Sequence, residues 1–117
     1  MAPTETIIDQ ARKLVAVLSV YVDFMPRNKK FTFGDRIITH ALAMTENLVE
    51  AYYGPRNVKL DKINNANIKL ELIRQILRIL FEMQNHNVKK HAYLNREIDN
   101  LGVNLGGWRK QLRCGET

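Results

Sequence analysis

Apolar residues recur at steps of three and four along most of the chain, which is the spacing of one face of an α-helix. Four segments carry this pattern, at about residues 4–24, 33–53, 59–84 and 88–113. No stretch keeps the alternation of apolar and polar residues that predicts a β-strand. Because the segments are similar in length and joined by short links, the pattern predicts an all-α protein. We expect a single domain over residues 1–117, folded as an antiparallel up-down four-helix bundle.

Capping and stop residues mark the ends of the first two segments. Either Thr4 or Thr6 can cap the first helix, and Thr6 with Asp9 three residues later resembles a capping box. Pro26 and the stretch PRNKK are expected to end that helix and to form a loop. Thr32 is then the candidate N-cap of the second helix. A Gly-Pro pair at residues 54–55 predicts the end of the second helix.

The third segment carries two apolar stripes. At about 100° per residue, the first contains Ile63, Ala66, Leu70, Ile73, Leu77, Leu80 and Phe81. The second, on the roughly opposite side, contains Ile68, Leu72, Ile76, Ile79 and Met83. A helix that is apolar almost all round must be covered on both sides. We therefore expect the second stripe to pack against another subunit; the alternative is that flanking helices cover it within one chain.

The fourth segment places two glycines beside its core stripe. That stripe consists of Leu94, Ile98, Leu101, Leu105, Trp108 and Leu112. Gly102 and Gly106 lie on its flank, where the missing side chains leave a shallow groove. Because glycine inside a helix costs about 1 kcal/mol relative to alanine, we expect the groove to receive a neighbouring helix or subunit. The alternative is a frayed or kinked end, against which the unbroken stripe argues.

The charge balance favours a polyanionic partner. Eighteen Lys and Arg stand against 12 Asp and Glu, a formal net charge of +6. This excess favours nucleic acid through phosphate neutralisation and counterion release; the alternative is a basic surface with no specific partner. The candidate nucleic-acid-binding residues are Arg27, Lys29, Lys30, Arg36, Arg109, Lys110 and Arg113. Without an aromatic platform for reading bases, binding is expected to be electrostatic.

Two arginines on the polar arc of the third segment are candidates for binding a partner protein. Arg74 and Arg78 are four residues apart, and the same arc carries Glu71 and Glu82. Those carboxylates would repel phosphate, which favours a protein partner over RNA. The alternative is a set of ordinary surface ion pairs, each worth about 0.3–0.5 kcal/mol.

The residue patterns of an enzyme or metal site are not found in the sequence. His86 and His91 are five residues apart, which does not place both on one helical face. Arg36 and His40 are too close for the Arg-x4-6-His motif of helical ribonucleases. The single Cys114 provides no disulfide framework, and no phosphate-cradling glycine loop occurs. We expect no enzymatic activity, no metal and no cofactor.

The chain shows no targeting or membrane segment. No run approaches the ~18 apolar residues of a membrane span. The first ten residues lack a basic region followed by an apolar stretch, as a secretory signal requires. We expect a cytoplasmic protein with no membrane partner.

Three stretches together resemble a known family. IDNLGVNLGGWRK at residues 98–110 is similar to the closing signature of the accessory variability determinants, small four-helix-bundle proteins of diversity-generating retroelements. RNKKFTFGDRI at residues 27–37 resembles the opening of their second helix, and ELIRQILRIL at residues 71–80 resembles their third. Val103 stands where the signature often carries a basic residue. The same broad family includes proteins encoded in intervening sequences of bacterial large-subunit ribosomal RNA genes.

The resemblance implies a homopentameric barrel of helical bundles with a basic surface. It implies binding to the reverse transcriptase of the retroelement and to its template RNA, or an RNA/DNA hybrid, in support of mutagenic copying with errors at adenines. The accessory protein is not itself a polymerase. The alternative is a structural or ribosome-associated homo-oligomer of the intervening-sequence branch, with no reverse transcriptase partner. A regulator of duplex DNA is a weaker reading, because no short glycine turn joins two compact helices.

Overall fold

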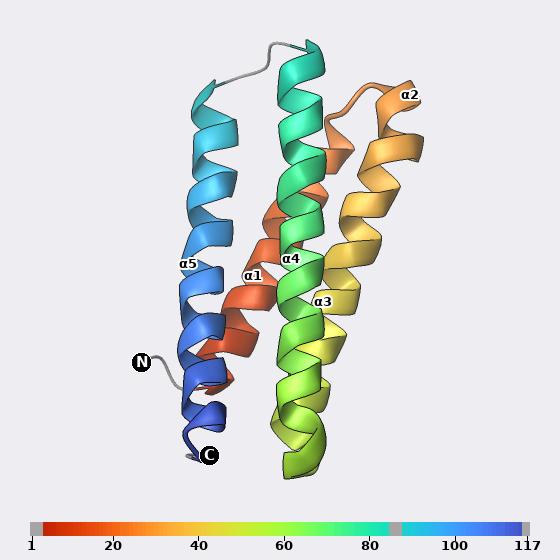
Figure 1. The fold of residues 1–117 in the computed structure, drawn as a ribbon. Coiled ribbons are helices and arrows are strands. Elements are labelled where there is room, and N and C mark those ends of the chain that lie inside the picture. The colour runs from red at the N-terminus through yellow and green to blue at the C-terminus, as the bar shows by residue number, and fades with distance from the viewer. Residues whose placement is uncertain (1–3, 85–87, 116–117) are drawn as a thin grey trace.

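Four long antiparallel helices enclose one apolar core (Figure 1). The computed structural model describes residues 4–84 and 88–115. Its elements are α1 (Thr4–Asp23), the short α2 (Arg27–Lys29), the π-helical turn η1 (Lys30–Gly34), α3 (Asp35–Tyr53), α4 (Arg56–Gln84) and α5 (Val88–Arg113). The described residues contain no β-strand. The prediction of an all-α four-helix bundle is confirmed.

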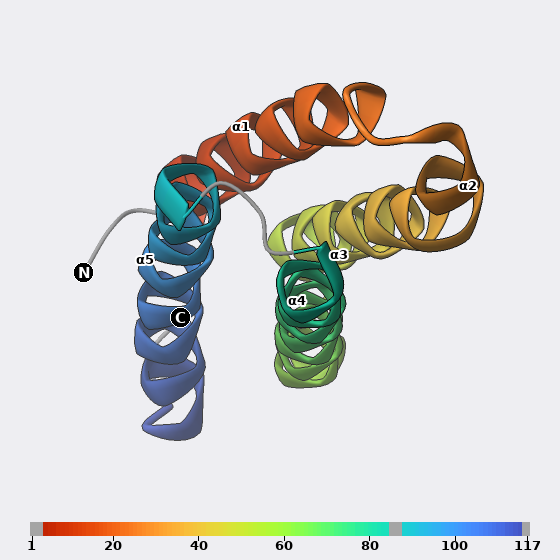
Figure 2. The same ribbon diagram turned by 90° about the horizontal axis from the view of Figure 1, so that it is seen from above.

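The helices form a closed ring in chain order. Each long helix packs against the next, and α5 returns to pack against α1. Seen from above, α1 and α3 lean away from α4 and α5 toward α2 (Figure 2). The bundle measures 45 × 23 × 19 Å. The start of α1, the α3–α4 link and the end of α5 lie at one end, while α2, η1, the end of α4 and the start of α5 lie at the other (Figure 1).

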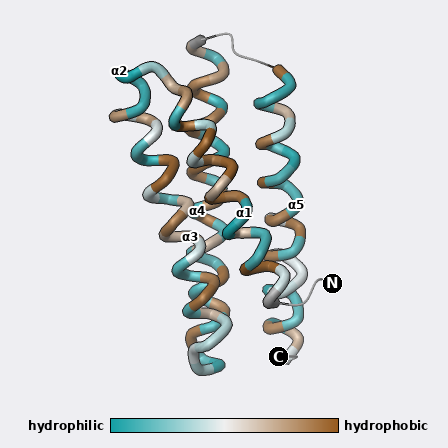
Figure 3. The backbone as a smooth tube through the Cα atoms, turned by 180° about the vertical axis from the view of Figure 1, so that it is seen from behind, coloured by the Kyte–Doolittle hydropathy of each residue, from teal (hydrophilic) through white to brown (hydrophobic). Residues whose placement is uncertain are grey.

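The core is built from one stripe of each long helix. These positions recur at three- and four-residue steps, and Figure 3 shows apolar segments in brown along the helices. The buried side chains are Ile7, Ala11, Leu14, Leu18 and Val22 of α1, Ile37, Ala41, Met44, Leu48 and Ala51 of α3, Ile63, Ala66, Leu70, Ile73, Leu77 and Leu80 of α4, and Leu94, Ile98, Leu101, Leu105 and Trp108 of α5. Among the described residues, no polar or charged side chain is fully buried.

The predicted stripes differ from the observed ones near the helix ends. Val22 of α1 is buried next to the partly buried Tyr21, and Ala51 of α3 is buried next to the exposed Tyr52. Leu112 is half-buried against the core. At both positions the smaller apolar residue is the fully buried one.

The second long helix begins earlier than predicted, because PRNKK is not a loop. Pro26 has φ −56° and ψ 147° and directly precedes α2. The backbone N–H groups of Lys29 and Lys30 donate to the Pro26 carbonyl at 3.0 and 2.8 Å. Thr32 is not an N-cap, since its hydroxyl lies within the helix and donates to the Asn28 carbonyl at 2.9 Å. A proline at a helix start loses nothing by lacking an N–H, so Pro26 opens this helix as well as ending α1.

Gly34 lets the π-helical turn approach α1 closely. A Cβ added at this position would lie 2.7 Å from Val22 Cγ1, well inside van der Waals contact. A π-helical turn adds one residue to a helical turn. The sequence from Lys30 to Gly34 therefore brings the one residue without a side chain against the end of α1.

The remaining boundaries differ by a few residues from the predicted ones. Helix α1 begins at Thr4, so Thr6 lies in its first turn and is not the N-cap. Gly54 follows the end of α3 and donates its N–H to the Glu50 carbonyl at 2.9 Å, which confirms the predicted stop. Helix α4 begins at Arg56, three residues before the predicted Lys59.

Candidate functional site

The predicted nucleic-acid-binding residues separate into two groups at opposite ends of the bundle (Figure 1). Arg27, Lys29, Lys30 and Arg36, in α2, η1 and the first turn of α3, form the first basic group. Arg109, Lys110 and Arg113, in the last turns of α5, form the second. The fold does not bring the two together, because the bundle is 45 Å long. The helix dipole also favours cations at the end of α5, so the second group has a structural explanation as well.

The first basic group is interleaved with aromatic rings. The Arg27 guanidinium carbon lies 5.7 Å from the centre of the Phe31 ring, and Lys29 Nζ lies 5.8 Å from that of Phe33. Phe31 is 60% exposed. Lys30 has an acidic neighbour in Asp23, at 3.8 Å. These cations have aromatic neighbours because cation and ring lie four residues apart, which is a neighbouring pair once the segment is helical.

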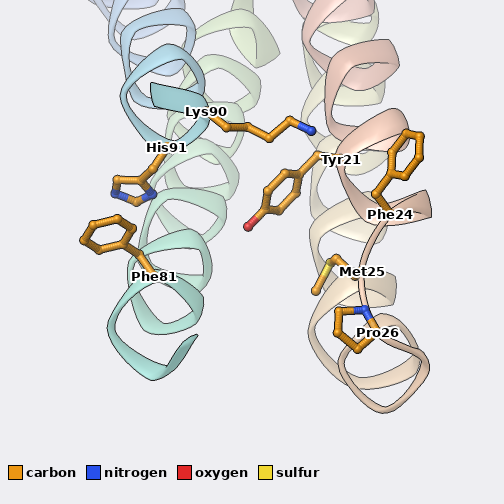
Figure 4. Close-up of a pocket in the computed structure, with 7 residues that line it drawn as sticks. All are labelled: Tyr21, Phe24, Met25, Pro26, Phe81, Lys90 and His91. Atoms are coloured by element: carbon orange, nitrogen blue, oxygen red, sulfur yellow. The ribbon is translucent and has the colours of Figure 1, made fainter. Parts of the chain in front are cut away.

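A pocket of about 200 Å³ opens between the end of α1, the end of α4 and the start of α5 (Figure 4). We call it the aromatic pocket; it is lined by Tyr21, Phe24, Met25, Pro26, Phe81, Lys90 and His91. Lys90 Nζ lies 5.8 Å from the centre of the Tyr21 ring and 5.6 Å from that of Phe24. The His91 and Phe81 rings stack with centroids 4.3 Å apart. Phe24 is 80% exposed at the rim.

Burial favours the neutral forms of Tyr21 and His91 in the aromatic pocket. It raises the pKa of the Tyr21 hydroxyl. Burial, followed by the positive charge of Arg78, lowers the pKa of His91. Both rings are therefore neutral near pH 7, and the pocket keeps Lys90 as its charged lining residue.

His40 on α3 has a similar shift in another setting. Burial lowers its pKa, with smaller contributions from Lys69 and Arg36. Its Nδ1 atom is buried without a hydrogen-bond partner among the described residues. Together with Phe31, Phe33 and Arg36, His40 lines a shallow groove beside the π-helical turn.

Arg74 and Arg78 differ in their ion pairs: Arg74 contacts two carboxylates closely, whereas Arg78 makes one longer contact. Arg74 donates to Glu71 and to Asp99 of α5, both at 2.7 Å, and so ties α4 to α5. The guanidinium of Arg78 is largely exposed, and its Nε lies 3.9 Å from Glu82. Of the two predicted partner-binding residues, Arg78 is therefore the more available.

The two glycines of α5 face different surroundings. Gly102 lines a groove between α4 and α5, where an added Cβ would make an ordinary contact of 3.7 Å with Leu70 Cδ2. At Gly106 an added Cβ would meet nothing within 4 Å. The groove predicted at Gly102 is present, but no helix of the same chain enters the space at Gly106.

The second stripe of α4 stays exposed in part in the single chain. Ile68 and Ile79 are 57% and 43% exposed, and Leu72 and Met83 are exposed as well. Ile76 is half-buried against the core. Helices α3 and α5 pack along α4 and cover the stripe in part, since they leave Ile68, Leu72, Ile79 and Met83 between 38% and 57% exposed. We call these five residues the outer stripe.

The described ranges contain neither a cluster of metal ligands nor a membrane-spanning helix. Within residues 4–84 and 88–115, no three His, Cys, Asp or Glu side chains gather as a metal would require. No helix there combines the length and apolar content needed to cross a bilayer. Cys114 is exposed and unpaired by any disulfide. His86, whose spacing from His91 does not suit a shared metal ion, lies outside the described residues.

The fold and its surfaces define a class, the small basic four-helix bundle with an exposed apolar stripe. A solved structure of a protein of unknown function from the S23 ribosomal protein family of Bacteroides thetaiotaomicron VPI-5482 shares this fold. The TM-score is 0.84 and the identity 16%, over 92% of this chain and 97% of that one. No family model and no curated protein matches the chain. At this identity the likeness establishes the fold.

Proposed function

We propose that this chain is a non-enzymatic adaptor that assembles with copies of itself and binds nucleic acid. The observation that carries the proposal is the exposed outer stripe of α4 on a molecule of net charge +6. Transfer of apolar surface from water into a contact is favourable. Association through this stripe gathers several basic groups into one particle, which strengthens binding to a polyanion through avidity.

The proposed assembly is a homopentamer, as the resemblance to the accessory variability determinants implies. The outer stripe supplies its apolar contact. The space beside Gly106 and the groove at Gly102 supply places where a neighbouring subunit can approach α5 closely. Both glycines then have a role that a single chain does not give them.

The proposed partners are a retroelement reverse transcriptase and its template RNA or RNA/DNA hybrid. The similarity of residues 98–110, 27–37 and 71–80 to that family supports this assignment. The first basic group is the proposed RNA contact, and Arg78 is the proposed polymerase contact. In this role the protein positions template and enzyme and performs no chemistry of its own, without metal or cofactor, in the cytoplasm.

RNA binding across a salt series tests the nucleic-acid role. We expect the affinity to fall steeply with salt, and the triple change of Arg27, Lys29 and Lys30 to Gln to weaken binding without changing the oligomer mass. The matched control changes Arg109, Lys110 and Arg113 to Gln, which removes the same charge at the other end of the bundle. Equal losses in both variants would indicate a general charge effect and no site. Affinity that is flat with salt would refute the role.

A pull-down with the reverse transcriptase encoded nearest the gene tests the polymerase role. Arg78→Gln should weaken capture of the enzyme more than it weakens RNA binding. Lys62→Gln is the matched control, because Lys62 also lies on α4 and pairs with a carboxylate, Glu50, at 3.2 Å. Wild-type capture by the Arg78 variant would remove this residue from the contact.

A second candidate is a structural or ribosome-associated homo-oligomer without a polymerase partner. It is favoured by the shared fold with a protein of the S23 ribosomal protein family. The two candidates share the assembly and differ in the partner. Failure to capture any reverse transcriptase, together with co-sedimentation with ribosomes, would support the second candidate.

A further inference from the structure

We infer that the aromatic pocket holds an unpaired base, so that the protein prefers single-stranded nucleic acid to a duplex. This inference rests on the proposed nucleic-acid role and adds the class of strand. The pocket is lined by residues from three helices, α1, α4 and α5 (Figure 4). Because these residues are far apart in the sequence, they form no sequence motif.

The walls of the pocket match the flat apolar face of a base. Phe24 presents its ring at the rim, where the residue is 80% exposed. The stacked rings of Phe81 and His91, 4.3 Å apart, form a second flat surface on α4 and α5. Bases stack on such surfaces irrespective of sequence, because every base has a π-face.

The charges around the pocket match the backbone that accompanies a base. Lys90 Nζ reaches from α5 to the Tyr21 and Phe24 rings at the end of α1. The chain continues from Pro26, on the pocket wall, directly into Arg27 and the first basic group. A strand whose base enters the pocket therefore brings its phosphates near cations.

The positive charges of Lys90 and the first basic group favour a nucleic acid over a protein segment as the occupant of the pocket. An apolar peptide would fit the rings and would gain nothing from the first basic group or Lys90. A nucleotide uses both the rings and the cations. The neutral Tyr21 hydroxyl and the neutral His91 ring can exchange hydrogen bonds with a base edge, which is accessible only when the base is unpaired.

The test compares two RNAs that carry the same number of phosphates, one unstructured and one a hairpin whose stem is closed by a non-nucleotide linker, so that every base is paired. Affinities are measured for the wild-type chain, for Phe24→Ala and for Phe24→Tyr at one salt concentration. Tyr53→Ala is the matched control, because Tyr53 is 78% exposed and ends α3 at the opposite end of the bundle. Phe24 contributes little to the core, so all of these variants should remain folded.

We expect wild type to bind the unstructured RNA more tightly than the hairpin. Phe24→Ala should weaken single-strand binding by about ten-fold, within the range for one lost base stack. It should leave hairpin binding unchanged, and Phe24→Tyr and Tyr53→Ala should retain wild-type affinity. A 2-aminopurine base in the strand should lose fluorescence on binding to wild type and regain it with Phe24→Ala.

Equal affinity for the two RNAs, or no effect of Phe24→Ala, would overturn the inference and leave salt-dependent RNA binding intact. Binding of neither RNA would overturn the proposed nucleic-acid role together with the inference. Saturation of the pocket by an apolar peptide that does not compete with RNA would assign it to a protein segment.

Discussion

Two glycines inside helices, Gly34 and Gly106, have different physical explanations. A Cβ at Gly34 would lie 2.7 Å from Val22 Cγ1, whereas a Cβ at Gly106 would meet nothing within 4 Å. Packing within the chain accounts for Gly34. Packing within the chain does not account for Gly106, where a glycine lowers the stability of the helix. The proposed contact with a neighbouring subunit would account for it.

Alanine at the two positions should therefore have opposite effects. Gly34→Ala should lower the free energy of unfolding by about 1–3 kcal/mol, because it overpacks the contact with Val22. Gly106→Ala should leave the stability of the isolated chain unchanged or raise it by up to about 1 kcal/mol through helix propensity. Chemical denaturation of both variants is the measurement. A Gly34→Ala protein as stable as wild type would contradict the close approach.

The two described histidines predict a pH dependence of stability. The folded pKa values of His40 and His91 lie below the ordinary 6.5, so the unfolded chain takes up protons first as the pH falls. Their contribution is fully present above about pH 6.5 and is lost as the pH falls from there toward the folded pKa values. A variant with His40→Gln and His91→Gln should lose less stability than wild type between pH ~7.5 and ~5.5, where carboxylates stay ionised. Parallel curves for the two proteins would show that neither histidine is shifted.

At the scale of elements, the four long helices could be predicted because each carries an unbroken apolar stripe. The start of the second could not, since the sequence around Pro26 predicts a helix end followed by a loop. A proline is compatible with a helix start as well as a helix end, and local spacing does not decide between them. The i,i+4 pairs Arg27–Phe31 and Lys29–Phe33 were a usable signal that this segment is helical.

The ion pair between Arg74 of α4 and Asp99 of α5 predicts how arginine substitutions on α4 change the free energy of unfolding. Arg74→Gln should lower the free energy of unfolding by about 0.5–1 kcal/mol at low salt, because Arg74 joins Asp99 across two helices. Arg78→Gln should change it by less, since the contact of Arg78 with Glu82 is local and long. Denaturation in low and high salt separates the two, because salt screens the exposed pair. A larger loss for Arg78→Gln would contradict the geometry.

For the whole molecule, features that lie on one helix could be predicted from the sequence, whereas a site built from several helices could not. The outer stripe could be predicted from periodicity alone, because it lies on one helix. The aromatic pocket could not, because Tyr21, Phe81 and Lys90 come from three helices that only the tertiary arrangement brings together. For the same reason the seven basic candidates could be found by composition, while their division between two ends of the bundle could not.

Charged residues placed on the outer stripe should break the assembly. Leu72→Glu should lower the particle mass without unfolding the chain, because the side chain is already exposed in the single bundle. Leu42→Glu is the matched control, since Leu42 is an exposed leucine on α3 outside the stripe. Sedimentation of both variants, with helix content from circular dichroism, is the measurement. Equal masses for wild type and Leu72→Glu would exclude the stripe as the contact.

The central claim, that this chain works as an oligomer built on the outer stripe, is tested most directly by the mass of the particle in solution. Size exclusion with light scattering of the full chain at micromolar concentration measures it. The account predicts a single species of five times the 13.6 kDa chain mass. A particle of one chain mass, with the outer stripe left in water, would contradict it.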